Sequence, residues 1–198
     1  MMPGSFDKIA FIYDWVEQRI LKDHQGSIHI LQTYLDLEKD DIIIDLGGGT
    51  GYIARYLATQ AKQVLLIDPS KNLLLKGKKS RVHPVKGSGT KIPCNSNSVS
   101  IIVLISVLHH IPKTYHEQVL SECKRVLDKH GVLCIIEAIP PESLLQKLFI
   151  HIEHVLVGKT FHRHPNELRN EVKKAGFQSV EAIFPKDHDW KYVIKAID

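Results

Sequence analysis

The sequence predicts an α/β fold, a doubly wound and mostly parallel sheet in a single domain. Three observations favour it. Short runs of β-branched residues alternate with helical patterns along the chain, which is typical of βαβ units. A glycine-rich turn at 47–51 directly follows the β-branched run at 42–46, which is the first predicted strand. The length of 198 residues suffices for one well-buried core and is short for two.

Two helices are predicted at the start of the chain, over 6–21 and 27–35, and strands and helices then alternate with short connections. Ser70 is a predicted helix N-cap, and Pro112 is predicted to start a helix that Gly131 ends in the C′ role. The predicted strands are 42–46, 64–67, 82–86, 99–105, 132–138, 179–184 and 190–196, and the helices between them are 50–60, 71–77, 112–127 and 165–175.

The composition indicates a soluble protein of a reducing compartment. No apolar run approaches the roughly 20 residues that span a bilayer. The first residues include acidic side chains and no basic head before an apolar segment, so no secretory signal is expected. The cysteines are odd in number and form no C-x-x-C pair, which argues against a disulfide framework and a thiolate zinc site. We therefore expect a cytoplasmic protein.

Charge is unevenly distributed, although the formal net charge of +4 is modest. No acidic residue lies between Asp68 and Glu117, while lysines are frequent in that interval. The cluster is either a solvated lysine face or a surface that attracts an anionic substrate or a nucleic-acid backbone. Because no aromatic residues are interleaved among the lysines, we favour the solvated face.

The glycine turn reads Asp-x-Gly-x-Gly-x-Gly, from Asp45 through Gly47 and Gly49 to Gly51. Glycine permits a sharp turn and a close approach of a ligand to the backbone. The dinucleotide pattern G-x-G-x-x-G needs a further glycine where Tyr52 stands. The spacing instead resembles the first motif of class I S-adenosylmethionine-dependent methyltransferases. That resemblance implies a seven-stranded sheet with an antiparallel last strand, S-adenosylmethionine as cofactor and S-adenosylhomocysteine as product.

Ligands of open α/β sheets bind at the carboxyl ends of the strands, and the first two predicted ends carry acids. In the family, the acid matching Asp45 supports the glycine loop and the amino group of the ligand; a buried, structurally paired aspartate is the alternative. Asp68 ends the second strand, where a carboxylate can accept hydrogen bonds from both ribose hydroxyls. Taken alone, an aspartate before Pro69 would be an ordinary turn former.

The third strand end departs from the family pattern. Small-molecule methyltransferases usually have an aspartate there that holds the adenine amino group, and this chain has Ser88 followed by Gly89. A hydroxyl can accept the same hydrogen bond, but without charge the bond is weaker by about 1 kcal/mol. Ser100 also stands where the family commonly has an aspartate. We therefore expect a modest affinity for the cofactor.

The fourth strand end, Ser106-Val-Leu-His-His-Ile-Pro, resembles the small-molecule branch of the family. His109 or His110 is expected to face the space between the sulfonium and the acceptor, and a histidine can take a proton near neutral pH. Alternatively, the imidazoles only shape the loop by bonding backbone groups. The candidate catalytic residues are His109 and His110, and the candidate cofactor-binding residues are Tyr13, Asp45, Gly47, Gly49, Gly51, Asp68, Pro69, Ser88, Gly89 and Ser106.

The opening segment 6–14 resembles that of quinone-biosynthetic methyltransferases, in which this helix closes over the cofactor. Tyr13 is accordingly expected to lie against the sulfonium, which an aromatic face attracts. In the alternative, Tyr13 is a core contact of an amphipathic helix. We divide the single domain into a helical cap (1–38), a cofactor core (39–138), a substrate-cover insertion with its helix (139–178) and a final strand pair (179–198).

The predicted insertion bears on the acceptor. Its apolar segment 141–161 is expected to line a pocket for an apolar or aromatic small molecule. Its histidines could bind a metal, but thiolates and acidic partners at ligand spacing are missing apart from Glu153, so no metal is expected. The histidines considered are His151, His154, His162 and His164, which we assign to a lid.

Two other functions are alternatives to this one. Base-amine methylases of this fold carry Asn/Asp-Pro-Pro-Tyr/Phe after the fourth strand, and its absence here argues against a nucleic-acid acceptor. Alternatively, the chain is a catalytically weak, cofactor-binding interaction subunit, because Ser88, Thr90 and Ser100 replace acidic residues. The acceptor atom and the oligomeric state are left open.

Overall fold

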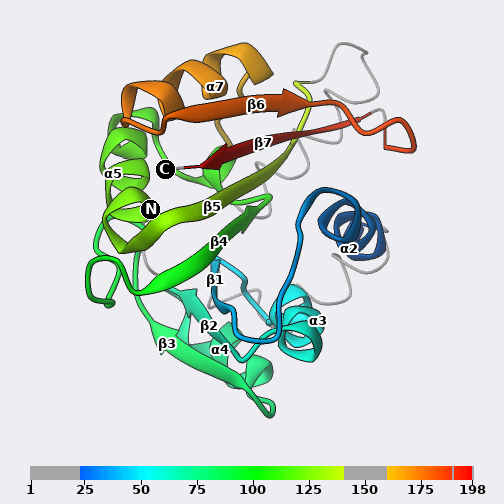
Figure 1. Ribbon diagram of the computed structural model, residues 1–198, viewed down its shortest axis with the longest axis vertical. Helices are drawn as coiled ribbons and strands as arrows, with labels where there is room; N and C mark the ends of the chain where they lie inside the picture. Colours follow the sequence, from blue (N-terminus) through cyan, green and yellow to red (C-terminus); the bar gives the residue numbers. More distant parts are fainter. Residues whose placement is uncertain (1–22, 141–159, 189, 198) are drawn as a thin grey trace.

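A computed structural model describes residues 23–140, 160–188 and 190–197 (Figure 1). Its strands are β1 (Ile42–Leu46), β2 (Gln63–Asp68), β3 (Val82–Lys86), β4 (Val99–Ile105), β5 (Leu127–Ala138), β6 (Ser179–Ile183) and β7 (Lys191–Ile197). They form one seven-stranded sheet in the order β3-β2-β1-β4-β5-β7-β6. The pairings from β3 to β5 are parallel, and β7 is antiparallel to β5 and β6. The predicted sheet, with its antiparallel last strand, is confirmed.

Helices cover both faces of the sheet. They are α2 (Asp23–Tyr34), α3 (Tyr52–Gln60), α4 (Lys71–Gly77), α5 (His116–Val126) and α7 (Pro165–Lys174), with short 3-10 turns η1 (Leu108–His110) and η2 (Lys113–Tyr115). Figure 1 shows α5 and α7 on one side of the sheet and α2 and α3 on the other. Successive residues of β1 separate the two cores: Ile43 packs with the α2 and α3 residues, and Ile44 packs with those of α5 and α7. Burial on both faces explains why the strands are almost continuously apolar.

Local helix signals were partly correct. The hydroxyl of Ser70 accepts a hydrogen bond from the Leu73 N–H at 3.3 Å, as an N-cap should. Pro165 is the first residue of α7, where its missing N–H costs nothing. Pro112 does not start α5, because η2 intervenes and α5 begins only at His116.

The predicted C′ role of Gly131 is wrong. Helix α5 ends at Val126, and Leu127 is already extended and pairs with Val99 in the sheet. The next pair along is Ile101 with Val132, so residues 128–131 form an irregularity within β5. The left-handed conformation falls on His130, with φ of 71°, and not on the glycine. A Cβ at position 131 would lie 3.0 Å from the Asp128 carbonyl oxygen, so close approach explains the glycine.

Some predictions fall on residues that the structure does not describe. They are the helix over 6–21 with Tyr13, and the apolar segment 141–159 with His151 and His154. The four-part division of the domain therefore stays a prediction. In the described part of the chain, no helix is long and apolar enough to cross a membrane, and Cys94, Cys123 and Cys134 are free thiols.

Chain order creates a switch point between β1 and β4. From β1 the chain proceeds outward to β2 and β3, and then returns to β4 on the other side of β1. In open α/β sheets, ligands bind at the carboxyl ends of the strands beside such a point. The ends of β1, β2 and β4 are Leu46, Asp68 and Ile105, so the predicted site residues that follow them share one edge of the sheet.

Candidate active site

The turn between β1 and α3 has the backbone that its glycines allow. Gly47, Gly49 and Gly51 all have positive φ, at 77°, 55° and 73°. At Gly47 a Cβ would also lie 2.7 Å from Val107 Cγ1, on the turn after β4. The Gly47 N–H donates to the Ile67 carbonyl oxygen at 2.6 Å, which fixes the turn against β2. A side chain at Gly47 would be both strained and obstructed.

Asp45 lies beneath this turn. Its side chain is 1% exposed, and a Cβ on Gly48 would come within 2.2 Å of its Oδ2 atom. Gly48 is therefore a glycine because of the carboxylate below it, a reason that the spacing of the other glycines does not reveal. The buried position matches the alternative of a structural aspartate, and any contact with a ligand amino group stays a proposal.

Asp68 joins β2 to the glycine turn. Its carboxylate is 6% exposed; Oδ2 accepts from the Gly49 N–H at 3.0 Å and Oδ1 from the Ser70 N–H at 2.7 Å. Pro69, between them, is half-buried. The ribose role of Asp68 stays a proposal.

Ser88 and Gly89 lie in the loop after β3. The Ser88 hydroxyl is exposed and hydrogen-bonds the Thr90 hydroxyl at 3.0 Å, within its own turn. Helix α5 fixes this loop: Glu122 accepts from the Ile92 N–H at 2.8 Å, and Arg125 donates to the Ile92 carbonyl at 3.0 Å. The side chain of Arg125 also pairs with Glu122 at 2.7 Å. Ser88 thus lies at the carboxyl edge, on a loop that side chains of α5 hold in place.

Ser100 has no part in this site, contrary to the inference drawn from the family pattern. Its hydroxyl donates to Asp41 Oδ1 at 2.7 Å and accepts from the Ile42 N–H at 3.1 Å. Both partners lie at the start of β1, and thus at the opposite edge of the sheet. The Ser100 hydroxyl thus holds β4 to β1, and the presence of a serine at this position gives no information about the affinity for the cofactor.

A buried acid holds the turn after β4. Glu137 lies near the end of β5 and is 3% exposed. Its Oε1 accepts from the N–H groups of Val107 and Leu108 at 3.0 and 2.7 Å, and its Oε2 lies 2.5 Å from His109 Nδ1. Ser106 begins the turn with φ of 56°, which is uncommon outside glycine, and its N–H donates to the Ile136 carbonyl.

Three imidazoles meet at this turn. His109 is buried; its ring centroid lies 4.0 Å from that of His110 and 4.9 Å from that of His162, which stacks on it with 9° between the planes. His110 is half-buried by surface area. Burial, then the neighbouring His109 and His162, holds the pKa of His110 well below its usual value. His110 is therefore a neutral imidazole at neutral pH.

A second histidine–carboxylate pair supports η1 from α5 and α7. His116 Nε2 donates to the carbonyls of Leu108 and Ile111 at 3.2 and 3.0 Å, and its Nδ1 lies 2.9 Å from Glu171 Oε2. Arg163 pairs with the other Glu171 oxygen at 3.3 Å. Burial raises the pKa of Glu171, but the His116 bond and charge and the Arg163 charge outweigh it, so the pKa is lowered overall.

Glu137, His116 and Glu171 were not predicted. Glu137 alone had a signal: an acid one residue before the end of an apolar strand, at the edge where ligands bind. His116 and Glu171 are 55 residues apart, and no spacing pattern connects them.

Lys191 was also missed. It is 1% exposed and donates to the Ser27 hydroxyl of α2 at 2.7 Å. Burial lowers its pKa to about 7. It opens the antiparallel strand β7, opposite Ala138 of β5, and so lies at the carboxyl edge.

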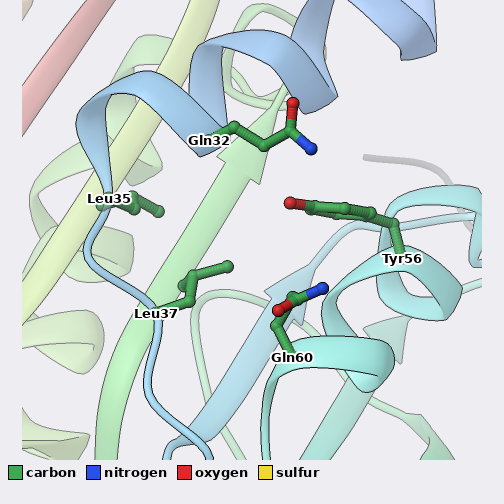
Figure 2. A pocket seen from close by; sticks show the side chains of 5 residues that line it. All are labelled: Gln32, Leu35, Leu37, Tyr56 and Gln60. Atoms are coloured by element: carbon green, nitrogen blue, oxygen red, sulfur yellow. The ribbon is translucent and has the colours of Figure 1, made fainter.

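A hollow beside α3 is lined mainly by neutral side chains. Its volume is about 260 Å³. In Figure 2, Gln32, Leu35 and Leu37 face Tyr56 and Gln60 of α3 across it. This space lies beside the C-terminal half of α3, and of the five described residues that line it only Tyr56 has an ionisable side chain. The carboxyl edge is therefore the candidate active site. Within the described ranges, no group of His, Cys, Asp or Glu residues is placed to hold a metal ion.

Comparison with known proteins shows which proteins the chain is similar to. Residues 44–135 match the family described as methyltransferase domain. Demethylmenaquinone methyltransferase of Thermotoga maritima is 25% identical over 93% of this chain and 95% of its own length. A solved S-adenosylmethionine-dependent methyltransferase of the same organism, described as a possible histamine N-methyltransferase, has a TM-score of 0.78 at 19% identity and 99% coverage of both chains.

A further solved structure contains the product of the cofactor. It is phospholethanolamine N-methyltransferase 2 of Haemonchus contortus, in complex with phosphomonomethylethanolamine and S-adenosylhomocysteine. Its TM-score is 0.74 at 18% identity, over 97% of this chain and 57% of that one. At such identities the two solved structures establish the fold.

The residues present fit S-adenosylmethionine. The turn from Gly47 to Gly51 has no side chains where a ligand would approach its backbone, apart from Thr50, and α3 begins directly after it. Asp68 places a carboxylate at the end of the adjacent strand. Residues 44–135 match a methyltransferase domain, and the fold of the chain is that of solved S-adenosylmethionine-dependent methyltransferases.

Proposed function

We propose that this methyltransferase acts on a small molecule with an apolar or aromatic body, and that the acceptor atom loses a proton to the histidine pair at η1. The observation that carries the proposal is the shared edge: the glycine turn, Asp68 and His109–His110 follow three adjacent strands, β1, β2 and β4. The similarity to a relative named for demethylmenaquinone supports an acceptor of this kind.

The chain's residues divide into two groups. Asp45, Gly47, Gly49 and Gly51 would hold the amino-acid part of the cofactor, because backbone N–H groups at a helix start suit a carboxylate. Asp68 and Pro69 would hold the ribose, and Ser88 and Gly89 would hold the adenine. Ser106 and Tyr13 would line the rest of the cofactor pocket.

Methyl transfer needs alignment and, for a protonated acceptor, a base. S-adenosylmethionine supplies the methyl group: the acceptor atom bonds to its carbon, the sulfur keeps the electron pair of the bond that breaks, and S-adenosylhomocysteine leaves. The proton of the acceptor atom passes to an imidazole of the His109–His110 pair, which later releases it to water. The Glu137 and His116 bonds hold the turn in place for this transfer.

Two measurements test the proposal. Titration calorimetry with S-adenosylmethionine and S-adenosylhomocysteine should show heat for both, and no heat for either would contradict the cofactor site. Methyl-labelled S-adenosylmethionine is then incubated with quinols, phenols and amines, and separately with RNA. Label should pass to small, organic-extractable products. Label only in the RNA fraction would contradict the small-molecule acceptor.

A further inference from the structure

The turn after β4 places three imidazoles and one carboxylate in a confined space. His109 contacts both His110 and His162, and it is also the ring that touches the Glu137 carboxylate. Imidazolium ions at such ring separations repel one another, whereas a carboxylate at hydrogen-bond distance favours the charged form of its partner. Because the carboxylate contacts His109, a single positive charge is held most favourably on His109.

The protons can be placed from the donors around Glu137. Backbone N–H groups of Val107 and Leu108 can only donate, so both use Oε1 as acceptor. Oε2 and His109 Nδ1, 2.5 Å apart, share one proton. Burial raises the pKa of Glu137, but the charge and bond of His109 and the Leu108 N–H outweigh it, so the pKa is lowered overall. Glu137 is therefore ionised, and His109 Nδ1 carries the proton.

The remaining ionisable groups around the cluster are compatible with this arrangement. Burial raises the pKa of the Tyr192 phenol, which stays neutral and donates to the Arg163 carbonyl at 3.1 Å. The Arg163 guanidinium pairs with Glu171. His162 stacks on His109 and is subject to the same repulsion as His110. Of the three rings, His109 is the one that contacts the carboxylate, and His110 is the one whose pKa burial and its neighbours lower.

We infer that Glu137 and His109 are positioning residues, a fixed ion pair that keeps His110 as the neutral imidazole, and that His110 accepts the proton of the acceptor during methyl transfer. The inference rests on the proposed function and deepens it. His109 cannot take this proton, because its two nitrogens are already protonated. The lone pair of neutral His110 takes it, and the positive charge that results on His110 is repelled by His109, which favours release of the proton to water after transfer.

Histidine-ring NMR tests the ionisation without cofactor or acceptor. Long-range ¹H–¹⁵N spectra distinguish the imidazolium from each neutral tautomer, and they are recorded from about pH 5 to pH 9. Single His109→Gln and His110→Gln variants assign the signals. In the wild type we expect His109 to be doubly protonated at neutral pH and His110 to be neutral.

Glu137→Gln removes the charge and keeps an oxygen for the Val107 and Leu108 N–H groups. As the pH rises, His109 of this variant should lose its proton at a lower pH than His109 of the wild type. As the pH falls, His110 of this variant should gain a proton at a higher pH than His110 of the wild type. Glu181→Gln, at an exposed glutamate of β6, is the matched control and should leave the signals of His109 and His110 in place.

A neutral His109 at neutral pH in the wild type, or a charged His110, would overturn the inference. So would a His109 titration that is the same in Glu137→Gln and in the wild type. If Glu137→Gln does not fold, the wild-type titration decides alone. Failure of this test leaves the cofactor site standing, whereas absence of calorimetric heat with S-adenosylhomocysteine would remove the proposed function whatever the ionisation of the histidines.

Discussion

The carboxylate of Asp68 illustrates how one residue serves both fold and function. It holds the glycine turn through Gly49 and the start of α4 through Ser70, and it lies at the edge where we propose that the ribose binds. The strand-end aspartate was predictable from its distance to the glycine turn. Its two backbone partners were not, because they depend on the conformation of the turn.

Asp68→Asn tests the ribose assignment. The amide keeps the size of the side chain but loses the charge and one acceptor, so the dissociation constant for S-adenosylhomocysteine should rise about tenfold, which is about 1.4 kcal/mol. Titration calorimetry measures it. Asp36→Asn, at an exposed carboxylate beyond α2, is the control and should change nothing. An unchanged constant in Asp68→Asn would remove the ribose role.

Gly47→Ala tests the turn itself. The left-handed backbone and the contact with Val107 together should lower the free energy of unfolding by about 2 kcal/mol. Urea denaturation measures this loss. The double variant Gly47→Ala/Val107→Ala should lose less than the sum of its single variants, since the second change removes the obstructing methyl groups. Strict additivity would show that Val107 does not obstruct position 47.

Helices α5 and α7 are coupled to η1 through His116 and Glu171. Loss of the charge in Glu171→Gln should lower the free energy of unfolding at pH 7 by about 2 kcal/mol, because a hydrogen bond to a charged group is lost. Since the pKa of Glu171 is lower in the folded protein, the stabilisation is fully present above the unfolded value of about 4.3 and disappears as the pH falls through the folded value.

Denaturation curves of wild type and Glu171→Gln at pH 7 and near pH 3 measure this difference. Glu181→Gln, at an exposed glutamate of β6, should match the wild type at both. A difference that stays constant or grows toward pH 3 would contradict the ionic origin.

Strand β7 is joined to α2 by the buried Lys191. Because its pKa is about 7 in the folded protein and 10.5 ordinarily, the unfolded chain binds more protons between these values. Stability should therefore rise with pH from 7 toward 10, by at most about 1.4 kcal/mol per pH unit, and Lys191→Met should abolish this rise.

Denaturation of both proteins from pH 7 to pH 10 measures the slope. Lys195→Met is the control, since Lys195 is on the same strand and donates to the Tyr34 carbonyl at the end of α2. An equal slope in Lys191→Met and wild type would contradict the assignment.

At the scale of the molecule, the two edges of the sheet differ in character. At the amino edge, Ser100 and Asp41 hold β4 to β1 through short side-chain bonds. At the carboxyl edge, the turns carry the glycines, Asp68 and the histidine cluster. Lys71 and Lys76 of the lysine-rich interval lie on α4 and Lys86 lies on the edge strand β3, where exposed cations also discourage pairing with other sheets. Lys91 of the same interval is exposed in the loop after β3, at the carboxyl edge. This placement fits the solvated lysine face.

The same division explains what the sequence could predict. Apolar runs, the Ser70 cap and the glycine spacing are local, and they predicted the strands and the edge that carries the site. The position of Gly131 misled, because pairing of Leu127 with Val99 ends α5 earlier than the local signal indicates. The expectation for Ser100 was wrong for another reason. The family pattern gives the position of Ser100 in a motif, but it does not show that the Ser100 hydroxyl donates to Asp41. The Glu137 and Glu171 pairs depend on contacts between distant segments.

The central claim is that the cofactor lies across the carboxyl ends of β1 and β2. A crystal structure of the protein grown with S-adenosylhomocysteine tests it most directly. We predict the ribose hydroxyls within hydrogen-bond distance of Asp68 and the amino-acid part against the turn from Gly47 to Gly51. Ligand in the hollow between α2 and α3, or the glycine turn closed by the protein's own side chains, would contradict the claim.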